Sequence, residues 1–288
     1  MNISEGSMVT ITDQKARSHS VVIENGKQFF TNHGSISHDE IVSAGEGGVV
    51  ASSNGMLYTI FTPSLQDFVV GMPRGAAVIY PKDAAQIIEL GDLRAGSKVL
   101  EAGVGSGSLS LHILRTIGDS GILTSCEIRE EFLKVAKKNV TKYLGNLPEN
   151  WETQLIDIAD FRSDTVYDCI VLDLLNPWDM IENVHKHLRP GGHFVCYLAT
   201  TTQMSRLVEK LKETSNWTDP IGSETLYREW HMQGLSVRPQ HRMNGHTGFL
   251  VHTRRMADGV KVPPRRQKPA KGAYGADYEA SKSATSSD

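Results

Sequence analysis

Apolar residues in the first seventy positions fall into short runs that are separated by turn residues. Runs rich in β-branched and aromatic residues predict strands, and the Asn-Gly and His-Gly pairs between them predict turns. The predicted strands are Met8–Thr12, Val21–Ile23, Val49–Ala51 and Leu57–Phe61. We therefore predict a small N-terminal β domain over residues 1–70.

From residue 71 onward the apolar pattern alternates between strand and helix. Short continuous apolar runs are followed by segments whose apolar residues recur at helical spacing. The predicted strands are Lys98–Ala102, Ile122–Cys126, Thr153–Ile156, Cys169–Leu172 and His193–Leu198. The predicted helices are Tyr80–Leu90, Ser108–Ile117, Arg129–Tyr143, Trp178–Leu188 and Thr202–Thr214, with Pro190–Gly192 as the turn before the last of these strands. This alternation is typical of an α/β domain with a parallel sheet.

The end of the chain departs from that alternation. Two apolar runs near Glu224–Met232 and Thr247–His252 have no helix between them, so we predict that they pair as antiparallel strands. The α/β domain then spans residues 71–255. Residues 256–288 are rich in Pro, Lys, Ser and Ala and carry little apolar surface to bury, which predicts a disordered tail.

Composition narrows the class of protein. The 288 residues contain no apolar run of the roughly 18–20 residues that a membrane span needs, and the first residues do not have the pattern of a signal peptide. We therefore expect a cytoplasmic protein without membrane contact. The three cysteines lie in or beside predicted strands, which predicts buried reduced thiols. Since no Cys or His cluster has metal-ligand spacing, we expect no metal site.

The charge distribution is uneven, although the formal net charge is only −3. Between Leu226 and Lys271 the chain has ten Lys or Arg residues, two acids and four histidines. Such a segment forms either a phosphate-binding face or an ordinary solvated surface followed by a basic tail. Charge alone favours the second interpretation.

Residues 98–109 predict a strand, a glycine-rich turn and the start of a helix. The glycines Gly103, Gly105 and Gly107 alternate with other residues, which lets a ligand approach the backbone at a helix N-terminus. A dinucleotide fingerprint has the spacing G-x-G-x-x-G. The spacing here, with Glu101 two residues earlier, resembles motif I of the class I methyltransferases, which bind S-adenosylmethionine.

Acidic residues end the next two predicted strands. Glu127 follows the glycines by about two dozen residues, where a carboxylate can accept hydrogen bonds from both ribose hydroxyls of an adenosine. Alone it fits a helix-entry acid equally well, but together with the glycines it favours nucleoside binding. Asp157 or Asp160 would suit the adenine amino group, or either could bond its own backbone in a turn.

Asp173 ends the fourth strand and is followed by the residues Asn176-Pro177-Trp178. Ligands sit at the carboxyl edge of an open parallel sheet, where a carboxylate, an amide and an aromatic face suit a flipped nucleobase. Trp178 could instead pack in the core, as large aromatics usually do. Tyr80 could likewise be a second stacking surface or a core residue.

Four stretches resemble the tRNA adenine-N1 methyltransferases that modify adenosine 58 in the T-loop, in particular the bacterial form of the actinobacterial kind. The stretches are residues 72–87, 99–109, 172–178 and 238–247, which extend over nearly the whole chain before the tail. The first and last are far more specific than the glycine turn. The last combines basic, amide and imidazole groups in a loop that could reach phosphates or lie at a subunit interface.

The resemblance implies a doubly wound, mostly parallel seven-stranded α/β sheet, S-adenosylmethionine as cofactor, tRNA as partner and a homotetramer. The cofactor contacts that it implies are at Gly103, Gly105, Ser106, Gly107, Ser108, Leu109, Glu127, Phe132, Asp157 and Asp173. It assigns catalysis to Asp173 and places Tyr80 near the target base, and the further substrate residues that we predict are Trp178, Arg242 and His246. Asn176 stands where the family often has an acid, which weakens any role for a second carboxylate.

We therefore expect methyl transfer to N1 of adenosine 58, giving 1-methyladenosine. The product ring is cationic, and a carboxylate at Asp173 would stabilise it while accepting a hydrogen bond from the 6-amino group. A methyltransferase for a protein carboxylate or a small molecule is one alternative, against which the basic C-terminal region and the Asn-Pro-Trp stretch argue. A non-catalytic tRNA-binding subunit is another, but it would be expected to have lost the glycines and Asp173.

Overall fold

A seven-stranded sheet forms the centre of the computed structural model, which describes residues 2–75 and 78–263. Its strands lie in the order β12-β15-β11-β10-β7-β8-β9. They are β7 (Lys98–Ala102), β8 (Ile122–Glu127), β9 (Trp151–Leu155), β10 (Tyr167–Leu172), β11 (Leu188–Leu198), β12 (Ile221–Ser223) and β15 (Phe249–Arg254). The five strands from β7 to β11 are parallel, and β15 pairs antiparallel with β11 and β12. The mostly parallel seven-stranded α/β prediction is confirmed.

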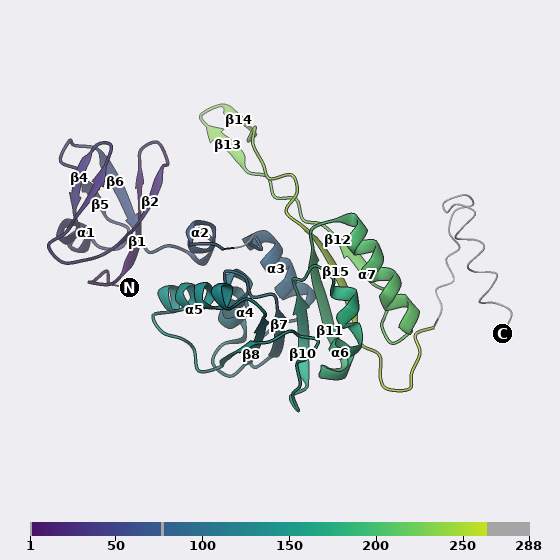
Figure 1. Cartoon of the computed structure of the whole chain (residues 1–288). Coiled ribbons are helices and arrows are strands. Elements are labelled where there is room, and N and C mark those ends of the chain that lie inside the picture. The colour runs from purple at the N-terminus through teal and green to yellow at the C-terminus, as the bar shows by residue number, and fades with distance from the viewer. Residues whose placement is uncertain (1, 76–77, 264–288) are drawn as a thin grey trace.

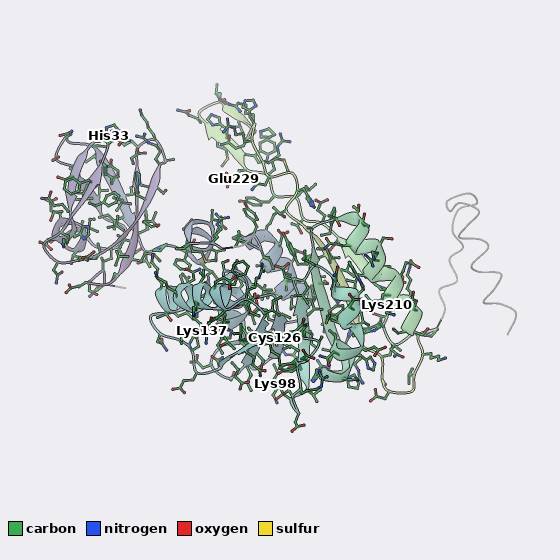
Figure 2. The ribbon with its side chains drawn as sticks, in the orientation of Figure 1. His33, Lys98, Cys126, Lys137, Lys210 and Glu229 are labelled. Atoms are coloured by element: carbon green, nitrogen blue, oxygen red, sulfur yellow. The ribbon has the colours of Figure 1, made fainter. Side chains whose placement is uncertain are left out.

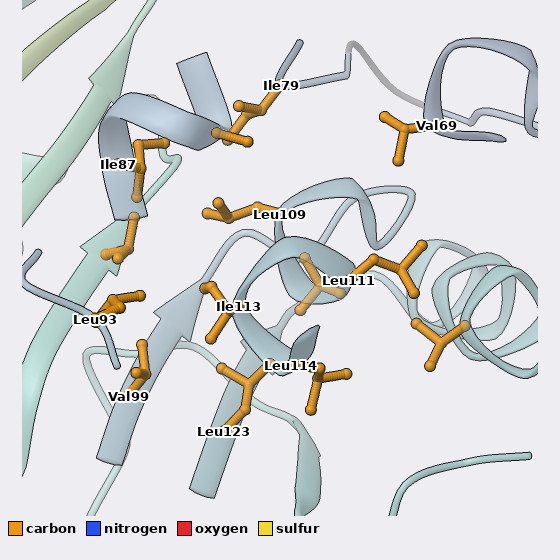
Figure 3. Packing of buried hydrophobic residues seen from close by; sticks show 14 of the residues in the cluster. Val69, Ile79, Ile87, Leu93, Val99, Leu109, Leu111, Ile113, Leu114 and Leu123 are labelled. Atoms are coloured by element: carbon orange, nitrogen blue, oxygen red, sulfur yellow. The ribbon is translucent and has the colours of Figure 1, made fainter. Parts of the chain in front are cut away.

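Helices cover both faces of this sheet (Figure 1). On one face lie α3 (Pro81–Leu90), α4 (Ser108–Ile117) and α5 (Glu130–Leu144), and on the other lie α6 (Ile181–His187) and α7 (Thr201–Thr214). Successive side chains of a strand point to opposite faces of the sheet. Val99 therefore packs under α3 and α4, whereas Leu100 packs towards α6 and α7. Figure 3 shows Leu109, Ile113 and Leu114 of α4 between the sheet and α3.

The N-terminal residues form a separate four-stranded antiparallel sheet, in the order β2-β1-β6-β5, beside a two-stranded β3-β4 hairpin (Figure 1). The elements are β1 (Met8–Asp13), β2 (Ser18–Val22), β3 (Gln28–Thr31), β4 (Gly34–Ser37), α1 (His38–Ala44), β5 (Val49–Ala51) and β6 (Leu57–Phe61). They enclose their own apolar core around Ile11, Ile36 and Ile60. The helix α2 (Leu65–Gly71) then leads towards the central sheet. The apolar pattern of the sequence did not predict β3, β4, α1 or α2.

Two predictions for the segment between β10 and α7 are wrong in detail. Pro190–Gly192 is not a turn before a strand: β11 begins at Leu188, and the extra residues form an irregularity between the pairs Tyr167–Leu188 and Cys169–His193. The predicted helix from Trp178 begins instead as a 3-10 turn, Pro177–Met180, before α6. Pro177 is the first residue of this 3-10 turn, and Asn176 before it makes no side-chain cap.

The predicted antiparallel pair near the C-terminus is also different. β15 pairs with the short β12, whereas Trp230–Gln233 (β13) pairs with Ser236–Pro239 (β14). Gly234, with φ near +55°, turns the chain back on itself at this point. The hairpin therefore forms the tip of an arm, residues 224–247, that projects from the sheet (Figure 1).

Cys126, Cys169 and Cys196 are free and buried, as predicted. No helix within residues 2–75 and 78–263 is long and apolar enough to cross a membrane. In the same residues no group of three His, Cys, Asp or Glu side chains is placed to hold a metal ion. Residues 264–288 of the predicted tail, and residues 76 and 77 of the stretch 72–87, lie outside the described residues.

Candidate active site

The glycine turn and Asp173 meet at the carboxyl ends of β7 and β10. These neighbouring strands lead to helices on opposite faces, so their ends form the crevice where open α/β sheets bind ligands. The backbone N–H of Asp173 donates to the carbonyl of Ala102 at 2.9 Å. A Cβ on Gly103, whose φ is +90°, would stand 2.1 Å from the Asp173 carbonyl oxygen. Only glycine permits this close approach.

Three carboxyl groups influence one another around this crevice. Burial is the main cause that raises the pKa of Asp173 to about 7, and the charge of Glu127 adds to it while Arg129 opposes it. Burial likewise raises the pKa of Glu101 to about 7, against the lowering effect of hydrogen bonds from two serines. The carboxyl groups around this crevice therefore favour a bound cation.

Glu101 lies under the turn, 1% exposed, and is held by a chain of hydrogen bonds. The hydroxyls of Ser110 and Ser125 each donate to its Oε2 at 2.7 Å, and the indole N–H of Trp151 donates to Ser125 at 2.9 Å. Its other oxygen, Oε1, has no hydrogen-bond partner. An unpartnered buried carboxyl oxygen leaves one acceptor free for a donor that enters the site.

Glu127 faces the turn itself. Its Oε2 accepts a hydrogen bond from the Gly105 N–H at 3.1 Å, and its Oε1 accepts from the N–H groups of Ile128 and Arg129 at 3.0 Å. The Arg129 guanidinium also stacks over the Phe132 ring, 3.7 Å from its centre. Glu127, Arg129 and Phe132 therefore form one wall beside the glycines.

The other predicted cofactor residues differ in how they are placed. Asp157 is exposed and its Oδ1 accepts a hydrogen bond from the Ala159 N–H, as in a turn. Ser106 is buried in the turn, and Ser108 donates its hydroxyl to the Ile79 carbonyl at 2.8 Å. The Leu109 side chain packs in the core (Figure 3). Ser108 and Leu109 thus hold the turn in place with their side chains.

Asn139 is a residue of this site that the sequence reasoning missed. It is 1% exposed, and its amide nitrogen donates to the carbonyls of Pro73 and Ser106 at 3.0 and 2.9 Å. It therefore joins α5, the segment before α3 and the glycine turn. Its position could have indicated its role, because Asn139 is a polar residue between the apolar positions Ala136 and Val140 of a predicted helix.

Tyr80 and Arg242 line a separate cavity of about 940 Å³, between α2, α3 and the arm. Its lining also includes Tyr227, Lys82 and Glu229, so aromatic, basic and acidic groups share it. Glycine-turn residues, Glu127 and Asp173 are not among the described residues that line it. The half-buried Tyr197 lies between the two regions: burial is the main cause that raises the pKa of its phenol, and the charges of Asp83 and Asp173 add to this effect.

Trp178 and His246 do not line this cavity. Trp178 packs against the α6–α7 face of the sheet, and the Arg206 guanidinium lies 4.1 Å from its ring centre. The His246 Nδ1 lies 2.7 Å from Glu224 Oε1, and this interaction is the main cause that raises its pKa. His246 thus joins the two ends of the arm.

The chemistry of these residues fits S-adenosylmethionine, which carries a sulfonium cation, an ammonium group and an adenosine. The Gly103 backbone lies directly against the Asp173 backbone, and Glu101 and Asp173 supply acidic groups beside the turn. Glu101 Oε1 is a free acceptor. The side chains at this site are mainly hydrogen-bond acceptors. They therefore match a cationic ligand that carries hydroxyl and amine donors.

Comparisons with known proteins agree with this geometry. A family model described as the GCD14 subunit of a tRNA methyltransferase complex matches residues 55–238, and a model described as TrmI-like N-terminal matches residues 2–50. The chain is 33% identical over 245 residues to the tRNA (adenine(58)-N(1))-methyltransferase TrmI of Thermus thermophilus. That alignment covers 85% of this chain and 95% of the relative.

Two solved structures extend the similarity to the fold. A SAM-dependent O-methyltransferase from Thermotoga maritima superposes with a TM-score of 0.85 and 29% identity, covering 93% of this chain and 97% of that one. The tRNA (m1A58) methyltransferase TrmI from Aquifex aeolicus superposes with a TM-score of 0.79 and 26% identity, covering 89% and 100%.

Proposed function

The chain belongs to the TrmI and GCD14 family of tRNA methyltransferases, and we propose that it transfers a methyl group from S-adenosylmethionine to N1 of adenosine 58 in the tRNA T-loop. The observation that carries the proposal is the contact of the Gly103 backbone with Asp173 at the switch point of the sheet. It brings the glycine turn and Asp173 together where this fold binds ligands.

Gly103 to Gly107, Glu101, Glu127 and Asp173 would hold the cofactor, which supplies an electrophilic methyl group when bound. Glu127 already accepts hydrogen bonds from the turn, so the turn and Glu127 are pre-arranged with respect to each other. Phe132 and Arg129 would cover the adenosine side. Asp157 would reach the adenine from the exposed edge of the sheet.

Asp173 would act on the target base. Its carboxylate can accept a hydrogen bond from the 6-amino group of adenine, and its charge stabilises the ring as that ring becomes cationic. Because the group is poorly hydrated, this electrostatic contribution is larger than it would be in water. Tyr80 and Arg242, which line the 940 Å³ cavity, would bind the nucleotides around the target base by stacking and by phosphate contact.

The test is incubation with labelled S-adenosylmethionine and unmodified tRNA, followed by digestion to nucleosides. We expect the label in 1-methyladenosine, and a tRNA with guanosine at position 58 should accept none. Label in a different nucleoside, or none in tRNA, would contradict the proposal. A small-molecule or protein methyltransferase would leave tRNA unlabelled, and so would a non-catalytic subunit.

We also propose that the protein works as a homotetramer in the cytoplasm, where tRNA is its partner. The arm supports self-association because several of its large apolar side chains are exposed, namely Leu226, Tyr227, Trp230, Met232, Leu235 and Val237. An apolar surface of this kind on a projecting hairpin is typical of a protein–protein interface. Figure 2 shows Glu229 near the base of this hairpin, away from the central sheet.

A further inference from the structure

A cluster of three polar side chains joins the first turn of α3 to the end of the arm. The Lys82 ammonium donates to Asp83 Oδ1 and to Thr247 Oγ1, each at 2.6 Å. The Thr247 hydroxyl donates to Asp83 Oδ2, also at 2.6 Å. Each member therefore contacts the other two, although Thr247 lies more than 160 positions away in the sequence. We call this cluster the clasp.

The carboxylate of the clasp is buried and its two partners are half-buried, so the hydrogen bonds of Asp83 do not compete freely with water. Asp83 is 1% exposed, and the Lys82 side chain is 14% exposed. Removing one partner would leave a buried carboxylate oxygen unpaired, which costs more than the loss of a surface ion pair. Asp83 also lies in the first turn of α3, where the helix dipole favours a negative charge.

The end of the arm is fixed from the sheet side as well. The Tyr197 hydroxyl donates to the Thr247 carbonyl at 2.5 Å. A Cβ at the next residue, Gly248, would stand 2.3 Å from the Tyr197 ring, so the glycine lets that ring lie against the backbone. Thr247 is thus held by α3 through its side chain and by β11 through its carbonyl.

The two elements that the clasp joins are opposite walls of the 940 Å³ cavity. Pro81 and Lys82 of α3 line it on one side, together with Tyr80, and Arg242 and Thr247 line it from the arm. Tyr80 is the residue immediately before α3, so the orientation of the first turn sets where its ring lies. Near this point the arm is also held by the Tyr197 hydroxyl and by His246, whose ring contacts Glu224 and the Ala199 carbonyl.

We propose that Asp83 and Thr247 are positioning residues that fix the width of this cavity and thereby set the affinity for tRNA. The proposal rests on the proposed function, because it assigns the cavity to nucleotides beside the target base. The clasp touches neither the glycine turn nor Asp173, so its loss should weaken tRNA binding and leave cofactor binding in place.

The substitution Thr247→Val tests this directly, because it keeps the shape of the side chain and removes only the hydroxyl. We expect the KM for tRNA to rise about tenfold, as for loss of a hydrogen bond to a charged group, with kcat changed by less than about threefold. Binding of S-adenosylhomocysteine, measured by calorimetry, should stay within about twofold of the wild type. Thr247→Ser retains the hydroxyl and should restore the wild-type KM.

Thr116→Val is the matched control, since the Thr116 hydroxyl donates only to the His112 carbonyl within α4. It should leave the KM for tRNA unchanged. Hydrogen exchange provides a readout that needs no turnover: amides of residues 240–246 should exchange faster in Thr247→Val than in Thr247→Ser. Equal behaviour of the valine and serine variants, or parallel losses of tRNA and cofactor binding, would overturn the proposal.

These experiments distinguish a failure of the positioning role from a failure of the proposed function. If the wild-type protein forms no 1-methyladenosine, the proposed function fails and the exchange measurement alone reports on whether the clasp holds the arm. If the wild type is active and Thr247→Val has a normal KM, only the positioning role is wrong.

Discussion

Asp173 is the residue on which the chemistry depends most. The substitution Asp173→Asn keeps the shape of the side chain and removes the negative charge that would stabilise the cationic ring. We expect kcat to fall by about 100-fold or more, as for loss of one electrostatic contact in the transition state. Nucleoside analysis after single-turnover labelling measures this. Turnover near the wild-type level with intact cofactor binding would show that another group stabilises the ring.

The pKa of Asp173 near 7 gives a pH dependence. The ionised carboxylate is the useful form, so kcat/KM should rise about tenfold per pH unit below about pH 7 and level off above it. Glu101, whose pKa is also raised to about 7, could produce the same profile. The variant Glu101→Gln separates them, because it should retain the step if Asp173 is responsible and lose it if Glu101 is.

The raised pKa of Glu101 also predicts how the free energy of unfolding depends on pH. Its pKa is raised from 4.5 to about 7, so between these values the folded state keeps a proton that the unfolded chain has released. Its contribution to the free energy of unfolding is therefore present below about pH 4.5 and is lost as the pH rises through 7, by at most about 3 kcal/mol. Denaturant melts at about pH 5 and pH 8 should show this loss in the wild type. Glu101→Gln should reduce the difference between the two melts, and an equal difference would contradict the predicted pKa shift.

At the scale of the elements, the sequence was most informative where one local signal determined the outcome. The glycine turn, α4 and the strands β5, β6 and β7 lie where the apolar pattern placed them. The helix α2 was missed although Ser64 and Asp67 form a capping box, a signal that was present in the sequence. The arm was misassigned because an apolar run alone does not say whether it pairs with β15 or folds back at Gly234.

The helix α5 shows what a single local pattern does not contain. The need for Asn139 arises from the carbonyls of Pro73 and Ser106, which are 66 and 33 residues away in the sequence. Only the packed structure brings these three groups together. The clasp between α3 and the arm is a second case, since neither end of it carries a motif that points to the other.

This arrangement predicts the effect of Asn139→Leu. The substitution is close in volume and leaves the buried Ser106 carbonyl and the part-buried Pro73 carbonyl without this donor, so the free energy of unfolding should fall by about 1–3 kcal/mol. Because one of the carbonyls belongs to the glycine turn, the Kd for S-adenosylhomocysteine should also rise, by about tenfold. Asn146→Leu is the control, since that side chain is exposed on the loop after α5 and contacts only Leu147. A loss of stability without any change in Kd would limit Asn139 to a structural role.

At the scale of the whole molecule, the arm is the part that a single copy does not explain. Met232 is 76% exposed and Leu235 is completely exposed, on a hairpin that has few contacts with the rest of the chain (Figure 1). A monomer with such a surface would tend to aggregate, whereas an assembly would bury it.

The double substitution Met232→Lys and Leu235→Lys places two charges on this surface without touching the sheet. Sedimentation velocity should then show a smaller species than the wild-type protein, for which we propose a tetramer, with an unchanged S-adenosylhomocysteine Kd. The control Val49→Lys puts a charge on an exposed apolar residue of the N-terminal sheet and should leave the sedimentation coefficient unchanged. A tetramer that survives the double substitution would place the interface elsewhere, and a wild-type monomer would contradict self-association altogether.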